Sequence, residues 1–147
     1  MEDFCIANMG PGRATCFGAI PTNEHIKEWN DEMLTFAMVE DAEGLKNLKE
    51  ILTVPGLDVI SIGQNDLSTS LGYPGNPNHP KVQETLREMV REIKAAGHWA
   101  STTGGNTVEQ AKHAADMGFQ VLKFADAPML RSKATEMLKA ARAAIGK

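Results

Sequence analysis

The order of hydrophobic and polar residues alternates between two kinds of segment along most of the chain. In the first kind, apolar residues recur every three or four positions, as in a helix that buries one face. The second kind is a short continuous run of apolar residues, which is typical of a strand buried on both faces. The predicted strands lie near residues 34–39, 57–63, 99–103 and 120–125.

The predicted helices occupy the intervals around these strands. The clearest begins near Pro80 and ends at Gly97, and the apolar residues on its one face are Val82, Leu86, Met89, Val90 and Ile93. Further helices are predicted over residues 23–33, 42–52, 107–118 and 127–145. Strands joined by helical crossovers must be parallel, with both faces of their sheet covered. The pattern therefore predicts an α/β fold of four βα units.

Length and composition place this pattern in one domain. The chain has 147 residues, of which 42% are hydrophobic and 23% charged, as is usual for globular proteins. We expect a single domain over residues 1–147, with an irregular Gly- and Pro-rich segment at 1–22 and the βα units at 23–147.

Charge and hydropathy exclude several partners. The formal net charge is -4 and no cluster of Lys and Arg is present, so nucleic acid is not an expected partner. No apolar run approaches the roughly 20 residues that span a bilayer, and the first residues do not resemble a secretion signal. We therefore expect no membrane association and a cytoplasmic location. Cys5 and Cys16 are too few for a disulfide framework and are interpreted as reduced thiols, with a nucleophilic role left open.

Polar residues follow each predicted strand, where parallel α/β sheets place their ligand sites in both barrels and open sheets. Glu40 and Asp66 follow the first two strands and are 26 residues apart, which is one βα unit. Because neighbouring strands lie about 4.8 Å apart, the two carboxylates can reach one divalent cation, and their hard oxygens suit magnesium or manganese. The alternative is that acidic residues here only cap helices, for which Asp41 is a good candidate.

A long stretch from Met38 adds a family resemblance. It reads MVEDAEGLKNLKEILTVPGLDVISIGQNDLSTSLGYPGNPNHPKV and resembles the signature of the HpcH/HpaI aldolase family. These are metal-dependent pyruvate aldolases within the citrate lyase beta-like and phosphoenolpyruvate-utilising TIM barrels. A weaker similarity continues through AAGHWASTTGG and FADAPML. The resemblance implies that the four βα units form about half of a TIM (β/α)8 barrel, its C-terminal half.

The resemblance also implies a reaction and a set of site residues. Glu40 and Asp66 match the family's metal ligands, for Mg²⁺ or Mn²⁺ and less characteristically Co²⁺. The implied enzyme is a lyase that cleaves a 4-hydroxy-2-oxo acid to pyruvate and an aldehyde through a metal-stabilised enolate. Gly63, Asn65 and Asp66 match the segment that approaches the keto-acid carboxylate, and Thr103 matches the aldehyde side of the pocket. Thr103 stands where the family has an apolar residue. The alternative is therefore that Thr103 has only a structural role at the end of its strand.

The resemblance leaves part of the machinery unaccounted for. The family's catalytic His and Arg belong to the N-terminal half of the barrel, so no catalytic residue beyond the metal ligands is identified in this sequence. The four histidines are interpreted as surface or structural residues.

A half barrel exposes unpaired edge strands, so we expect a homo-oligomer or a complementing N-terminal half. The alternative to an aldolase is a catalytically incomplete half-barrel that binds metal and keto acid or acts only in assembly. A third reading, a lyase acting on an acyl-CoA thioester, lacks a basic segment for the coenzyme.

Overall fold

The computed structural model describes residues 17–105 and 107–146, which divide into two compact units. The first unit, Met1–Thr35, contains helix α1 (Thr22–Glu32), where the sequence predicts a helix over residues 23–33. His25 lies against Trp29 on this helix, with a ring separation of 5.0 Å. Most of the predicted irregular segment at 1–22, together with Cys5 and Cys16, lies outside the described residues.

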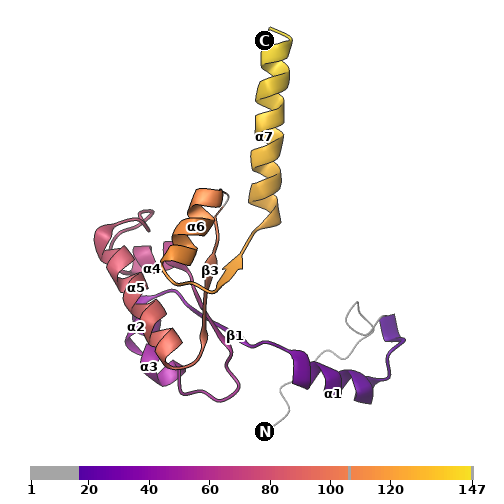
Figure 1. The fold of residues 1–147 in the computed structure, drawn as a ribbon, viewed down its shortest axis with the longest axis vertical. Coiled ribbons are helices and arrows are strands. Elements are labelled where there is room, and N and C mark those ends of the chain that lie inside the picture. The colour runs from indigo at the N-terminus through magenta and orange to yellow at the C-terminus, as the bar shows by residue number, and fades with distance from the viewer. Residues whose placement is uncertain (1–16, 106, 147) are drawn as a thin grey trace. The chain divides into compact units, whose positions relative to one another are not determined.

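The second unit, Phe36–Lys147, is built on a four-stranded parallel sheet. Its strands are β1 (Phe36–Val39), β2 (Val59–Ile62), β3 (Trp99–Thr103) and β4 (Val121–Lys123). They lie side by side in the order of the chain. Figure 1 labels β1 and β3 among them. The predicted α/β class and the four parallel strands are therefore confirmed. The strand order has no reversal, as in consecutive units of a (β/α) barrel.

The helices of this unit follow the prediction with two differences. They are α2 (Ala42–Lys46), α3 (Leu48–Ile51), α4 (Gln64–Ser70), α5 (Pro80–Ala95), α6 (Val108–Asp116) and α7 (Asp126–Ala144). The single helix predicted over residues 42–52 is divided, because Asn47 leaves helical geometry with ψ near 5° and ends α2 while it begins α3. The short helix α4 has no sustained apolar period and was not predicted. No helix in the described ranges is long and apolar enough to cross a bilayer.

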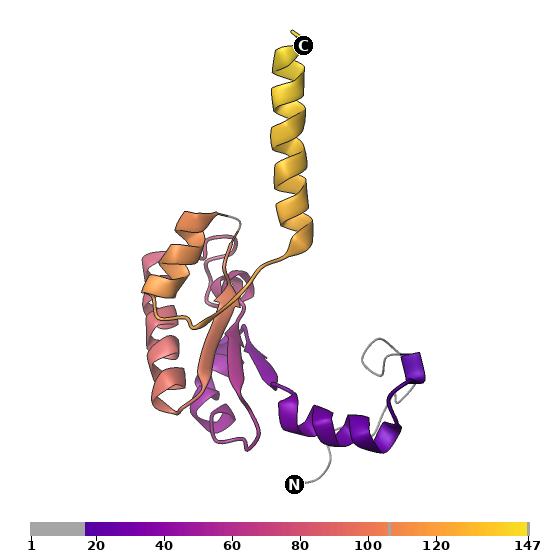
Figure 2. The same cartoon turned by 45° about the vertical axis from the view of Figure 1, so that its right-hand side comes forward.

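The core lies between the sheet and its helices. Every residue of the apolar stripe predicted on α5 is buried, with Leu86 and Ile93 fully excluded from solvent. They pack with Ile60 and Ile62 of β2 and Ala100 of β3 in one hydrophobic cluster. Figure 2 shows α5 and α6 on the same side of the sheet. The stripe on α5 therefore fixes which face of the sheet is covered by helices.

On the other face of the sheet, the side chains change from apolar at the start of the strands to polar at their carboxyl ends. Thr102 of β3 donates its hydroxyl hydrogen to the carbonyl of Ile62 and accepts from Gln64 of α4, so Thr102 faces the helices. Because side chains alternate along a strand, its neighbours Ser101 and Thr103 face the opposite way. The residues of β1 to β4 on that opposite face, from the start of the sheet to its end, are Phe36, Val59, Trp99, Met38, Ser61, Ser101, Val121, Thr103 and Lys123. Polar groups thus collect toward the carboxyl ends of the strands.

Truncation of the buried leucine on α5 gives a first testable result. Leu86→Ala is expected to lower the free energy of unfolding by about 2–5 kcal/mol, because Leu86 is fully buried and leaves a cavity. Urea denaturation followed by circular dichroism measures this loss. Val108→Ala is the control, because Val108 is 80% exposed, and it should stay within about 0.5 kcal/mol of wild type. Equal losses in the two variants would contradict the assigned core.

Candidate metal and substrate site

Glu40 and Asp41 follow β1 and have different roles. Asp41 is the N-cap of α2, where its Oδ1 accepts a hydrogen bond of 2.7 Å from the backbone N–H of Gly44. The predicted capping role is therefore confirmed for Asp41. Glu40 is partly buried, and its carboxylate has no hydrogen-bond or ion-pair partner among the described residues. The cap thus engages Asp41, whereas the neighbouring Glu40 carboxylate stays unpaired among the described residues.

Gly63 makes the space in which Glu40 lies. The backbone N–H of Gly63 donates to the carbonyl of Val39, so the ends of β1 and β2 are held together at 3.2 Å. A Cβ atom added at Gly63 would lie 2.7 Å from Oε2 of Glu40 and 2.8 Å from its Cβ. Since φ of Gly63 is -82°, glycine is needed here for room and not for backbone conformation. The Glu40 side chain therefore lies directly across Gly63.

Asp66 is presented by the first turn of α4, directly after β2. Its neighbour Leu67 is fully buried and anchors the helix, and Ser68 donates its hydroxyl hydrogen to the carbonyl of Asn65 at 2.7 Å. Asp66 itself is exposed and has no partner within the described ranges. The buried Leu67 and the hydrogen bond from Ser68 to Asn65 thus fix the first turn of α4, which carries the unpaired carboxylate of Asp66 at the end of β2.

The donor set at these two strand ends fits a hard divalent cation. Glu40 and Asp66 are carboxylates without protein partners, and they follow two strands that are adjacent in the sheet. Magnesium is typically bound through one or two carboxylates, with its other positions taken by water and substrate. Across residues 17–105 and 107–146, no group of three or more His, Cys, Asp or Glu side chains is gathered that could form a closed all-protein site. The residues present therefore suit an open site of the magnesium or manganese type.

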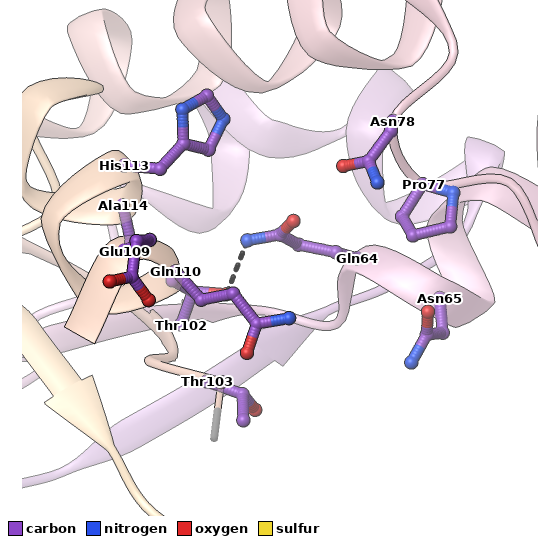
Figure 3. A pocket seen from close by; sticks show the side chains of 11 residues that line it. Gln64, Asn65, Pro77, Asn78, Thr102, Thr103, Glu109, Gln110, His113 and Ala114 are labelled. Atoms are coloured by element: carbon purple, nitrogen blue, oxygen red, sulfur yellow. Dashed lines mark hydrogen bonds between the residues drawn. The ribbon is translucent and has the colours of Figure 1, made fainter. Parts of the chain in front are cut away.

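A cavity of about 410 Å³ lies beside these residues, between α4, α6 and the segment before α5. Its lining contains two of the predicted substrate residues, Asn65 and Thr103, whereas Gly63 and both predicted metal ligands do not line it. The other side chains shown in Figure 3 include Gln64, Asn78, Glu109, Gln110 and His113. These residues were not singled out as substrate-binding from the sequence, because most lie on α6 or in a loop and not at a strand end. Side-chain amides and hydroxyls therefore supply most of the polar groups at the cavity.

Two ionisable side chains of the cavity have defined surroundings. Hydrogen bonds from its own backbone N–H and from the Thr107 side chain hold the pKa of Glu109 below its usual value, so it is a carboxylate at neutral pH. The Nε2 atom of His113 lies 3.2 Å from the Oε1 atom of Gln83, across from α6 to α5. His113 thus connects two helices at the edge of the cavity.

The histidines near the sheet are tied to the backbone. The two ring nitrogens of His98 each lie 2.8 Å from a carbonyl oxygen, those of Leu52 and Leu57. His79 is the N-cap of α5, where its Nδ1 accepts from the backbone N–H of Lys81 at 3.3 Å, and its ring stacks on Tyr73. These contacts give both imidazoles structural roles, as expected from the sequence.

Comparison with known proteins identifies the family. The family model described as HpcH/HpaI aldolase/citrate lyase matches residues 14–127, which is most of the chain. The chain belongs to this family. Its curated relatives include the 4-hydroxy-2-oxo-heptane-1,7-dioate aldolases of Shigella sonnei, 40% identical over 85 residues, and of Escherichia coli, 39% identical over 85 residues. Each match covers 58% of this chain and 32% of the relative, so it spans about a third of the relative's length.

Solved structures support the fold across more of the chain. The HpcH/HpaI aldolase from Desulfitobacterium hafniense is 25% identical with a TM-score of 0.74, covering 87% of this chain and 51% of that one. A family protein from Burkholderia cenocepacia is 25% identical with a TM-score of 0.76, covering 92% of this chain and 52% of that one. The four βα units of this HpcH/HpaI chain therefore correspond to about half of the fold of its structural neighbours, as the sequence predicts.

Proposed function

We propose that this HpcH/HpaI chain carries the metal- and keto-acid-binding half of a divalent-metal-dependent aldolase. The reaction would be cleavage of a 4-hydroxy-2-oxo acid to pyruvate and an aldehyde, or its reverse. The observation that carries the proposal is the pair of unpartnered carboxylates, Glu40 and Asp66, at the ends of adjacent strands. The curated relatives are named as aldolases of a compound of this class, 4-hydroxy-2-oxo-heptane-1,7-dioate.

The residues of this chain would divide the work as follows. Glu40 and Asp66 would hold Mg²⁺ or Mn²⁺, which when bound supplies a Lewis acid that polarises the carbonyl of the keto acid. Gly63 provides the space that lets Glu40 lie across the end of β2. Asn65 and Thr103 are exposed at the cavity, where an amide and a hydroxyl can orient the substrate by hydrogen bonds.

The second candidate is a half-barrel that binds metal and keto acid without turnover. It is favoured by the contacts of the histidines in the second unit. His79 and His98 are hydrogen-bonded to the backbone, and His113 at the cavity is hydrogen-bonded to Gln83. Under either candidate we propose that a second copy or a complementing N-terminal half pairs with the edge strands β1 and β4. That partner would supply the catalytic His and Arg that the family resemblance places in the N-terminal half of the barrel.

The two candidates differ in turnover and share a binding property. With 4-hydroxy-2-oxo-heptane-1,7-dioate and Mn²⁺, an aldolase releases pyruvate, which a lactate dehydrogenase assay records as loss of NADH absorbance. EDTA should abolish the signal and added Mn²⁺ should restore it. No pyruvate, combined with Mn²⁺-dependent oxalate binding in calorimetry, would support the half-barrel without turnover. Absence of both activities would contradict the two candidates together.

A further inference from the structure

Lys123, the last residue of β4, extends over the face of the sheet opposite α5 and α6. Its neighbour Leu122 packs against the hydrophobic core, so alternation along the strand places Lys123 on the other side. The Lys123 ammonium donates a hydrogen bond of 2.5 Å to the hydroxyl of Ser61 on β2. Because β3 separates β4 from β2, the lysine side chain must cross β3. A cation therefore lies over the middle of the sheet.

The charge of Lys123 has no counter-charge in the described part of the protein. The ion pairs there join Lys112 to Asp116 and Lys133 to Glu136, all of them well exposed. Lys123 is partly buried, and the neutral serine hydroxyl takes one of its three N–H donors. A cation drawn out of water is destabilised unless an opposite charge compensates it. The surroundings of Lys123 therefore favour an anion.

A second, independent observation comes from Ser101 on β3. Ser101 pairs with Ser61 in the sheet register and faces the same way as Lys123. It is fully excluded from solvent, and its hydroxyl has no hydrogen-bond partner within residues 17–105 and 107–146. Buried hydroxyls are nearly always paired, so an unpaired one beside an uncompensated cation points to a ligand that accepts hydrogen bonds.

We propose that Lys123, Ser61 and Ser101 form a binding site for a carboxylate group. One ammonium matches the single negative charge of a carboxylate, and the carboxylate oxygens can accept from the ammonium and from both hydroxyls. To enter, the carboxylate displaces the direct contact between Lys123 and Ser61. That the carboxylate belongs to the substrate of an aldolase rests on the proposed function, whereas the carboxylate site itself does not.

Two probes distinguish which part of such a substrate the site takes. Oxalate resembles the 2-oxo acid end, and succinate resembles the aldehyde fragment of a dioate. Each is titrated by calorimetry into the full chain in Tris buffer freed of metal by a chelating resin. We expect saturable binding of at least one probe. Tighter oxalate binding assigns the site to the keto acid, and tighter succinate binding assigns it to the aldehyde fragment. Absence of saturable binding of both would overturn the proposal.

Variants connect the binding to these residues. Lys123→Met is expected to weaken the affinity for the preferred probe by roughly 10- to 100-fold, the usual value of a charge-assisted hydrogen bond. Ser101→Ala should weaken it by a few-fold, on the order of one neutral hydrogen bond. Lys112→Met, which removes an exposed lysine on α6, is the matched control and should leave the affinity unchanged. Unchanged affinity in Lys123→Met would also overturn the proposal.

A measurement on the wild-type chain covers the case in which the lysine variant does not fold. Acetic anhydride labels exposed lysines, and peptide mass spectrometry reports the rate at each one. The preferred probe should slow the labelling of Lys123 and leave that of Lys133 unchanged, whereas equal rates with and without the probe would contradict the site. Asp66→Ala should keep this protection in metal-free buffer. Loss of metal binding with protection retained would therefore count against the proposed function alone.

Discussion

Asp66→Asn is expected to weaken Mn²⁺ binding by at least about 100-fold. The substitution removes the charge of one of the two proposed metal ligands. Mutating a residue that only hydrogen-bonds to a metal ligand typically lowers metal affinity by about 10–100-fold, so loss of a ligand should cost at least as much. Asparagine keeps the size of the side chain, and Asp66 is exposed, so the fold should be retained. Electron paramagnetic resonance of free Mn²⁺, titrated with protein, measures the affinity directly.

Asp41→Asn is the matched control for this variant. Asp41 is an exposed carboxylate next to Glu40, and asparagine caps a helix about as well as aspartate. Its Mn²⁺ affinity should stay within about twofold of wild type, since the cap does not bind the metal. Equal losses in Asp41→Asn and Asp66→Asn would show a general effect of acidic charge and would contradict the assignment of Asp66.

Gly63→Ala is expected to lower the free energy of unfolding by about 1–3 kcal/mol, the usual cost of an overpacked site. The added methyl group would lie 2.7 Å from Oε2 and 2.8 Å from Cβ of Glu40. The Cβ atom of Glu40 cannot move away unless its backbone moves too, so β1 and β2 must separate slightly. The Glu40 carboxylate must also turn away from the new methyl group. Mn²⁺ affinity should therefore fall along with stability, as measured by urea denaturation and metal titration.

A double-mutant cycle tests whether Glu40 is the cause. In a Glu40→Gly background both close contacts disappear, so Gly63→Ala should cost little there. In a Glu40→Ala background the contact with Cβ remains, and most of the cost should persist. The same stability loss of Gly63→Ala in all three backgrounds would mean that another neighbour limits the space at this position.

Local patterns in the sequence were sufficient for the element order. The apolar stripe on α5 follows directly from the periodicity of a helix, and the apolar run of β2 follows from its burial on both faces. The apolar run of β1 also predicted a strand, although Phe36 and Met38 on one face of β1 are about half exposed. Asn47 shows the limit of this approach, because the apolar stripe continues through residues 42–52 although the helix stops at Asn47 and restarts. A stripe reports which face is buried, and it does not report whether the backbone stays helical.

The candidate site was predictable only in part. Glu40 and Asp66 follow strands, and the DLS motif with its surroundings resembles a family signature, so both were predicted as site residues from the sequence. Glu109 and Gln110 were not, because they border the cavity only where the fold brings α6 to the same opening as α4, and these helices are far apart in the chain. The space that Gly63 leaves for Glu40 likewise depends on the tertiary structure.

The sequence by itself determined the α/β class and the parallel strands, and it predicted Glu40 and Asp66 as metal ligands, because each depends on periodicity or on short motifs. The sequence left open whether Glu40 also serves as a helix cap, and only the tertiary structure separated the capping Asp41 from an unpaired Glu40, since capping depends on backbone geometry. The tertiary structure also decided that Lys123 crosses β3 to reach Ser61 beside an unpartnered Ser101. Lys123 and Ser61 are 62 positions apart in the chain, and only the register of three neighbouring strands brings them together with Ser101.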